Sequence, residues 1–324
     1  MLHRREIILS GSAAALMGAS GSSRAQEFPK AGVPIKYIVP FPPGGLTDVM
    51  ARTVSQKLSE IWNVPVVVEN KAGGNAQIGA EQVAKGAADG TSLLAITLTH
   101  AANVSLFPNA GYSFTKDLRP LALLAGSPML VVVPANSVIR DFRDLQSVAR
   151  TRTLNAGSSG NGTPPHLTMA LFNDINKSEM THVPYRGGAL SMTDLIGGQL
   201  DVIFSNFPES IAQVKAGKLK PLALCSAARH PMLPDVPTTS EVSMPGLIVE
   251  NWTGAMLPAS TPDAIVDKFA REMVRIMATP EVEERARQQG FTITPKGPQD
   301  FANFLKSEID RWARIIKIAK ITAS

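Results

Sequence analysis

The chain has 324 residues, of which 44% are apolar and 18% are charged, and its formal net charge is +5. With 25 glycines and 24 prolines, this composition excludes a disordered chain, which is poorer in apolar residues, and collagen, which is far richer in glycine. The length leaves room for about two domains. The positive charge is small and scattered, which argues against a nucleic-acid partner.

The first 25 residues have the features of an export signal. Arg4 and Arg5 provide a basic start, residues 7–19 are apolar or small, and a small-residue cleavage pattern ends at Ala25. We therefore expect export with cleavage near Ala25. The arginine pair fits a twin-arginine signal loosely, so the choice between the Sec and twin-arginine routes stays open. No later run of about 18 apolar residues could span a membrane, so we expect a soluble mature chain.

The first half of the mature chain repeats a unit made of a short strand, a glycine-containing turn and a helix. The strands are indicated by β-branched runs, and each helix by apolar side chains three or four residues apart. These patterns predict strands at 35–40, 66–68 and 93–97 and helices at 47–62 and 78–85. The turns at 41–45 and 69–74 carry paired glycines.

The same pattern starts again in the second half. It predicts strands at 129–133, 153–156 and 201–204, a helix that opens at Pro164, and a helix that ends at Gly197 and Gly198. Thr163 stands where a helix cap is expected, and proline is favoured at the first helical position. Because both halves repeat the same unit, the sequence predicts two α/β lobes of similar construction.

The C-terminal part is predicted to be helical. Helices are expected at 262–277, from Pro280 and at about 299–320. Their apolar and aromatic residues recur at helical spacing, for example Ile265, Phe269 and Met273. Such stripes are typical of core packing, and we interpret them in that way rather than as a cofactor site.

The glycine-rich turns are the first candidates for chemistry. A turn between a strand and a helix aims backbone N–H groups and the positive end of the helix at one point, which favours an anion. The phosphate-binding versions are absent, because neither a P-loop nor a dinucleotide-binding glycine pattern follows the first strand. Each turn alone could also be a tight turn without a ligand. Four of them in two lobes favour a ligand cleft.

The turn at 157–161 is a candidate for a catalytic serine. It approaches the G-x-S-x-G pattern of a nucleophile elbow, but Asn161 occupies the last position and the pattern fails. A secreted hydrolase that works through Ser158 or Ser159 with His166 remains an alternative. For His166 itself, near the start of its helix, a capped histidine with satisfied hydrogen bonds and a ligand contact are both open.

Three charged residues near the turns each have two interpretations. Asp48 is either a first-turn carboxylate favoured by the helix dipole or the holder of a water that bridges to a ligand. Arg186 could pair with a ligand carboxylate or lie in solvent. Asp201 follows a glycine pair, where structural capping is the simplest role.

Metals and disulfides are not expected. The five histidines, His3, His100, His166, His182 and His230, show neither the H-E-x-x-H pattern nor the close cysteine pairing of a metal site. The single cysteine, Cys225, cannot form an internal disulfide and is interpreted as a buried apolar residue. Phe41, Tyr185 and Phe204 would allow an aromatic ring between the lobes, although core packing explains them equally well.

A set of short motifs spans nearly the whole mature chain in order. They are Phe41-Pro42-Pro43-Gly44-Gly45 with Asp48, Val68-Glu69-Asn70-Lys71, Gly162-Thr163-Pro164 with His166, Val183-Pro184-Tyr185-Arg186-Gly187-Gly188, Gly197-Gly198-Gln199-Leu200-Asp201 and Pro234-Asp235-Val236-Pro237-Thr238. With these motifs the chain resembles the Bordetella uptake gene (Bug) receptors, the periplasmic solute receptors of tripartite tricarboxylate transporters.

The resemblance implies a two-lobed periplasmic binding protein of type II, whose chain crosses twice between its lobes. Lobe one would comprise 26–127 and 252–324, and lobe two 128–251. The implied function is capture of an aliphatic or aromatic mono-, di- or tricarboxylate in the interlobe cleft and delivery to the membrane permease subunits. No cofactor, metal or catalytic residue is implied, and a monomer is expected. A carboxylate sensor with a signalling partner is a further alternative.

The resemblance and the turns together define the expected ligand-binding residues. The resemblance implies contact by the first turn, by its counterpart across the cleft and by a threonine after the third strand. The full set is Phe41, Pro43, Gly44, Gly45, Leu46, Thr47, Asp48, Thr97, Thr99, Ser158, Asn161, Gly162, Thr163, His166, Arg186, Asp201 and Phe204.

Overall fold

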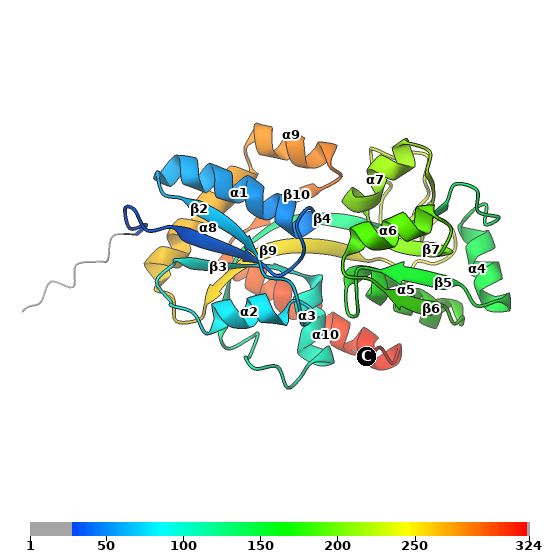
Figure 1. The fold of residues 1–324 in the computed structure, drawn as a ribbon, viewed down its shortest axis with the longest axis horizontal. Coiled ribbons are helices and arrows are strands. Elements are labelled where there is room, and N and C mark those ends of the chain that lie inside the picture. The colour runs from blue at the N-terminus through cyan, green and yellow to red at the C-terminus, as the bar shows by residue number, and fades with distance from the viewer. Residues whose placement is uncertain (1–27, 323–324) are drawn as a thin grey trace, which may run out of the picture.

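Residues 28–322 are described by the structure, a computed structural model, and they form a two-lobed α/β protein (Figure 1). The export signal expected at residues 1–25 lies outside the described residues. Each lobe contains three neighbouring parallel strands. They are β1 (Ile35–Val39), β2 (Val66–Asn70) and β3 (Ser92–Thr97) in one lobe, and β5 (Asn155–Ser158), β6 (Thr181–Pro184) and β7 (Val202–Asn206) in the other. The predicted two-lobed α/β fold is confirmed.

Two long strands connect the lobes. The first part of β4 (Leu118–Pro134) pairs antiparallel with β9 (Glu250–Pro258) and β10 (Thr292–Lys296), and its last part pairs with β7 and β8 (Leu219–Leu224). Figure 1 shows β4 and β9 running side by side from one lobe to the other. One strand thus belongs to the sheets of both lobes.

The strand β4 begins at Leu118, well before the predicted start at 129. Its first part contains Pro120, Gly126 and Pro128, which resemble strand breakers in the sequence. The structure accommodates the irregularity through register shifts against β9 after Pro120 and after Leu123. Such bulges allow a strand to continue past a residue that cannot join the hydrogen-bond ladder.

The helices predicted from the sequence are confirmed, with ends that agree within a few residues. The helices are α1 (Leu46–Trp62), α2 (Gln77–Ala84), α3 (Leu98–Leu106), α4 (Phe142–Thr151), α5 (Pro164–Asn176), α6 (Gly188–Ile196), α7 (Phe207–Lys215), α8 (Asp263–Met277), α9 (Pro280–Gln288) and α10 (Pro298–Ile318). The helices α3, α4 and α7 were not predicted. α3 follows β3 without a loop, because Thr97 caps it in a reciprocal capping box with His100.

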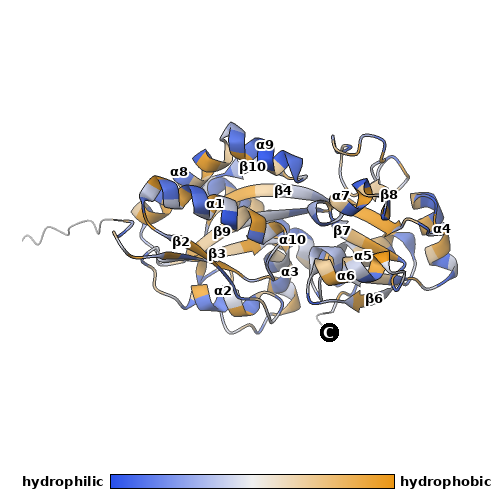
Figure 2. Cartoon of the chain, turned by 45° about the horizontal axis from the view of Figure 1, so that its top comes forward, coloured by the Kyte–Doolittle hydropathy of each residue, from blue (hydrophilic) through white to orange (hydrophobic). Residues whose placement is uncertain are grey.

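The core lies between the sheet and its covering helices. The predicted apolar stripes of the C-terminal helices are buried, including Phe269, Met273 and Trp312, and burial of such a side chain contributes roughly 1.5–3 kcal/mol. Figure 2 shows the central strands as apolar and the helices as mixed in hydropathy. Cys225 is buried, as interpreted from the sequence. Within residues 28–322, none of the helices combines the length and apolar character that a membrane span needs.

Candidate ligand-binding cleft

A cleft of about 560 Å³ lies between the lobes, at the point where several helices begin. The first turns of α1, α3, α5, α6 and α7 supply lining residues. Figure 1 shows the start of α1 (blue) facing α6 and α7 (green) across the gap between the lobes. The volume of the cleft falls in the range typical of small-molecule sites.

The electrostatic character of the cleft comes mainly from the backbone. Each helix start presents unpaired N–H groups and the positive end of a dipole, and such ends attract anions. Among the described residues that line the cleft, Arg186 and Glu209 carry charged side chains. The cleft therefore suits a small anion that is held by hydrogen bonds rather than by a counter-charge.

Three buried polar atoms in the cleft have no hydrogen-bond partner within the described residues. They are Thr99 Oγ1, Ser159 Oγ and Asn251 Oδ1, and all three residues line the cleft. An unsatisfied buried polar group costs about 1–3 kcal/mol, so native proteins pair nearly all of them. A ligand or ordered water in this cleft would satisfy the three atoms.

The first cleft loop, residues 41–45 between β1 and α1, is braced from behind by Asp48. The Asp48 carboxylate accepts hydrogen bonds from Gly44 N–H at 3.0 Å, Arg52 Nε at 2.9 Å and Asn70 Nδ2 at 2.8 Å. Burial alone would raise the pKa of Asp48, but these hydrogen bonds outweigh it and hold that pKa below its usual value. Asp48 is therefore an ionised support of the loop.

The second cleft loop, residues 158–163 after β5, is braced by two stacked histidines. The rings of His166 and His182 lie 3.8 Å apart at an interplanar angle of 2°. His166 Nδ1 accepts a hydrogen bond from Gly162 N–H at 3.0 Å, and Ser158 Oγ lies 2.6 Å from His182 Nε2. Burial lowers the pKa of His166 to about 3, helped by His182, and that of His182 to about 4. Both rings are neutral at physiological pH.

The structure brings most of the expected site residues together. Those that line the cleft are Phe41, Pro43, Gly44, Gly45, Leu46, Thr47, Thr97, Thr99, Thr163 and Arg186. Ser158, Gly162 and His166 belong to the brace of the second loop, and Asp48 to that of the first. Asn161 is in the second loop but is not among the lining residues.

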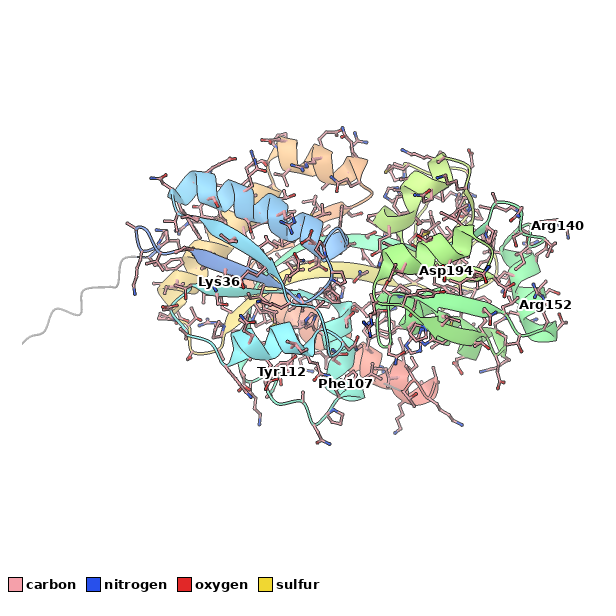
Figure 3. The ribbon with its side chains drawn as sticks, in the orientation of Figure 1. Lys36, Phe107, Tyr112, Arg140, Arg152 and Asp194 are labelled. Atoms are coloured by element: carbon pink, nitrogen blue, oxygen red, sulfur yellow. The ribbon has the colours of Figure 1, made fainter. Side chains whose placement is uncertain are left out.

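Two expected residues lie away from the cleft. Phe204 is fully buried in the core of its lobe. Asp201 accepts a hydrogen bond from Asn155 N–H at 2.8 Å and pairs with Arg152, which Figure 3 shows at the outer end of the second lobe. These positions agree with core packing for Phe204, one of its two open interpretations, and with structural capping for Asp201, its simplest one.

Several cleft residues were not expected from the sequence. Asn206 is the last residue of β7 and directly precedes α7, Glu209 lies in the first turn of α7, and Asn251 lies in β9. Asn206 ends a strand and starts a helix without a glycine turn, so the glycine signal used elsewhere could not find it. The sequence signal that could have identified Asn206 is its position at the junction between a predicted parallel strand and the helix that follows. The described residues contain no group of three or more histidine, cysteine, aspartate or glutamate side chains that could hold a metal ion.

Comparison with known proteins places these features in a family. The family model "Tripartite tricarboxylate transporter family receptor" matches residues 50–321. The protein BugT of Bordetella pertussis is 32% identical over 88% of this chain and 88% of its own length.

Two solved structures are similar throughout. The Rhodopseudomonas palustris protein Rpa4515 with adipate has a TM-score of 0.86 and 32% identity, covering 90% of this chain and 99% of its own. MatC from the same organism, with bound malate, has a TM-score of 0.82 and 29% identity over 88% of this chain and 99% of its own.

Proposed function

Because the chain belongs to the receptor family of tripartite tricarboxylate transporters, we propose that it binds a small organic carboxylate in the interlobe cleft. The observation that carries this proposal is the convergence of helix starts around the unpartnered atoms of Thr99, Ser159 and Asn251. The backbone N–H groups of the helix starts and the hydroxyls of Thr99 and Ser159 are donors that suit carboxylate oxygens. Adipate and malate in the two similar structures support the same ligand class.

The lobes are proposed to divide as 26–127 with 252–324 and 128–251. The paired crossing segments support this division, because Ser127 of β4 lies in register with Asn251 of β9. The C-terminal helices return to the first lobe, where α8 packs on α1 and α10 on α3. A ligand that touches both lobes favours the conformation in which the lobes are closed around it, with the connecting strands β4 and β9 as the hinge.

The proposed partners are the permease subunits of a membrane transporter, which would recognise the closed, ligand-loaded receptor in the periplasm. The proposal is for a monomeric receptor without a catalytic step, released from its export signal near Ala25. Deletion of the protein is expected to abolish uptake of its ligand. A loss of signalling with normal uptake would instead favour the sensor alternative.

The hydrolase alternative is not favoured by the geometry of the second loop. Ser158 is buried, does not line the cleft, and approaches His182 rather than His166. The hydroxyl that does line the cleft belongs to Ser159. Ester turnover that disappears in Ser159→Ala would overturn the pure-binding proposal.

A thermal-shift screen of aliphatic and aromatic carboxylates tests the proposed function. A carboxylate present at 100 times its dissociation constant is expected to stabilise the folded protein by about 2.7 kcal/mol. The corresponding neutral amides serve as matched controls, because they keep the shape and lose the charge. If no carboxylate raises the melting temperature, the proposal is wrong.

A further inference from the structure

The wall of the cleft in the second lobe extends well beyond the second loop. It is formed by α6 and α7, with Leu190, Ile196 and Gln213 among its lining residues. Leu190 and Ile196 are large apolar side chains that remain 55% and 38% exposed. Exposed apolar groups inside a ligand cleft indicate that an apolar part of the ligand covers them.

This wall also contains a carboxyl group, that of Glu209 in the first turn of α7. Glu209 is half-buried and lines the cleft. Its Oε1 accepts a hydrogen bond from Asn206 Nδ2 at 3.0 Å. Its Oε2 lies against Gly188, where an added Cβ would collide with it. Burial raises the pKa of Glu209 to about 7, against the opposing effect of the Asn206 hydrogen bond.

A chain of hydrogen bonds links Glu209 to the strands that connect the lobes. Asn251 Nδ2 donates to Asn206 Oδ1 at 2.8 Å, and Asn206 Nδ2 donates to Glu209. Glu209 Oε1 accepts this hydrogen bond, so Glu209 fixes which way the Asn206 amide points. Asn206 in turn fixes the Asn251 amide, whose unpartnered Oδ1 is left as an acceptor.

Both ends of this hydrogen-bond series, Asn251 and Glu209, can therefore accept a hydrogen bond from a donor on the ligand. Asn251 Oδ1 is a buried acceptor without a partner, and Glu209 is a carboxyl group in a partly desolvated wall. A second ligand carboxylate here would place an acceptor against Asn251 Oδ1. It would also be repelled by Glu209 whenever that carboxyl is ionised. A hydroxyl or ammonium group would satisfy the wall.

We propose that Glu209 and Asn251 form a donor-binding subsite, so that the ligand is a monocarboxylate with an apolar body and an amino or hydroxyl group at its far end. This inference rests on the proposed function, because the carboxylate end is bound as described above. Glu209 is then a specificity-determining residue that selects against dicarboxylates. Arg186 has the opposite effect on specificity, because its guanidinium could bind a second ligand carboxylate.

Calorimetric titration with matched acids tests the subsite. The probes are 6-aminohexanoate, 6-hydroxyhexanoate and adipate, with the four- and eight-carbon equivalents to cover other lengths. We expect the best amino or hydroxy acid to bind about tenfold more tightly than the diacid of the same length. A diacid that binds more tightly than both would overturn the subsite and leave the proposed function standing. If none of these acids binds, the subsite proposal fails, and the broader screen of aliphatic and aromatic carboxylates decides the proposed function separately.

Variants separate the subsite from general effects. In Glu209→Gln, the preference for the amino acid over the diacid is expected to fall about tenfold. Glu179→Gln removes the same charge from an exposed position in the second lobe outside the cleft and should keep the preference. Gly188→Ala, which forces the Glu209 carboxyl to move, should also weaken it. An unchanged preference in both cleft variants would refute the role of Glu209.

Discussion

The two cleft loops hold similar backbone turns in place by different chemistry. Behind the first loop, the ionised Asp48 gathers Gly44 N–H, Arg52 and Asn70. Behind the second, two neutral histidines and a serine do the corresponding task. In both loops the brace lies outside the cleft lining, so neither places its charge or its titrating group against the ligand. A loop can therefore be rigid without adding a counter-charge to its anion site.

The largest effect is expected from removal of the charged brace. Asp48→Ala leaves Gly44 N–H and Asn70 without their acceptor and should lower the free energy of unfolding by about 2–3 kcal/mol. It should also weaken ligand binding, because the first loop loses its support. Chemical denaturation and calorimetry measure the two effects.

Asp144→Ala is the matched control for this variant. Asp144 accepts from Arg140 Nε, Nη2 and backbone N–H in the same way, but on α4 and outside the cleft. It should leave ligand affinity unchanged. Equal losses of affinity in both variants would show that the brace of the first loop has no special role in binding.

The free energy of unfolding should depend on pH through the histidines behind the second loop and not through Asp48 behind the first. Burial lowers the pKa of His182 in the folded state to about 4, from its ordinary value of 6.5. The unfolded chain therefore binds this proton first as the pH falls, and stability that is present above pH 6.5 is lost toward pH 4. With allowance for solvent screening, this amounts to about 1 kcal/mol between pH 8 and pH 5.

In His182→Gln that part of the pH dependence should disappear, as measured by urea unfolding at both pH values. Asp48→Ala should leave the same slope unchanged, because the lowered pKa of Asp48 keeps it ionised throughout this range. The buried His166, whose pKa is lowered to about 3, keeps a slope of the same sign in every variant. A slope that falls in Asp48→Ala but not in His182→Gln would reverse the assignment of the two braces.

A smaller effect is expected at Thr99, whose buried hydroxyl lacks a partner. Thr99→Val keeps the shape and should weaken ligand binding about fivefold, or about 1 kcal/mol. Without ligand, its unfolding free energy should stay equal or rise, because an unsatisfied hydroxyl has been removed. Thr151→Val, on α4 and away from the cleft, is the control for affinity. A clear loss of stability in Thr99→Val would mean that the hydroxyl serves the fold.

The smallest effect is expected at Asp201. Asp201→Asn loses the ion pair with the half-exposed Arg152 but keeps an acceptor for Asn155 N–H. We expect a loss of less than about 0.5 kcal/mol and unchanged ligand affinity. A tenfold loss of ligand affinity would show that Asp201 contributes to ligand binding.

Local patterns predicted the glycine loops and the helices that follow them, because each depends on a few neighbouring residues. The lining residues Gly44, Gly45 and Thr163 were accessible in this way. Asn251 was not, since it is separated from Asn206 by many residues and meets it only through the pairing of distant strands. The same holds for Ser158 and His182, whose contact depends on the register of β5 and β6.

Burial was the second property that the sequence could not supply. Asp48 and Asp201 stand beside similar glycine pairs, yet the structure uses both as acceptors for backbone N–H groups rather than as cleft residues. Phe204 could have faced either surface of its strand, and only the packing of the second lobe decides that it points into the core. Long-range packing therefore determines which candidates reach the ligand.

The dependence of this cleft on backbone donors also has an evolutionary consequence. A substitution can remove a side chain but leaves the main-chain N–H groups at the start of α1 in place, unless the new residue is proline. Residues such as Leu190, Ile196 and Glu209 can therefore vary without loss of the anion anchor. A gene duplicate of this protein could acquire a new nutrient by drift along α6 and α7 while it remains a working receptor at every step.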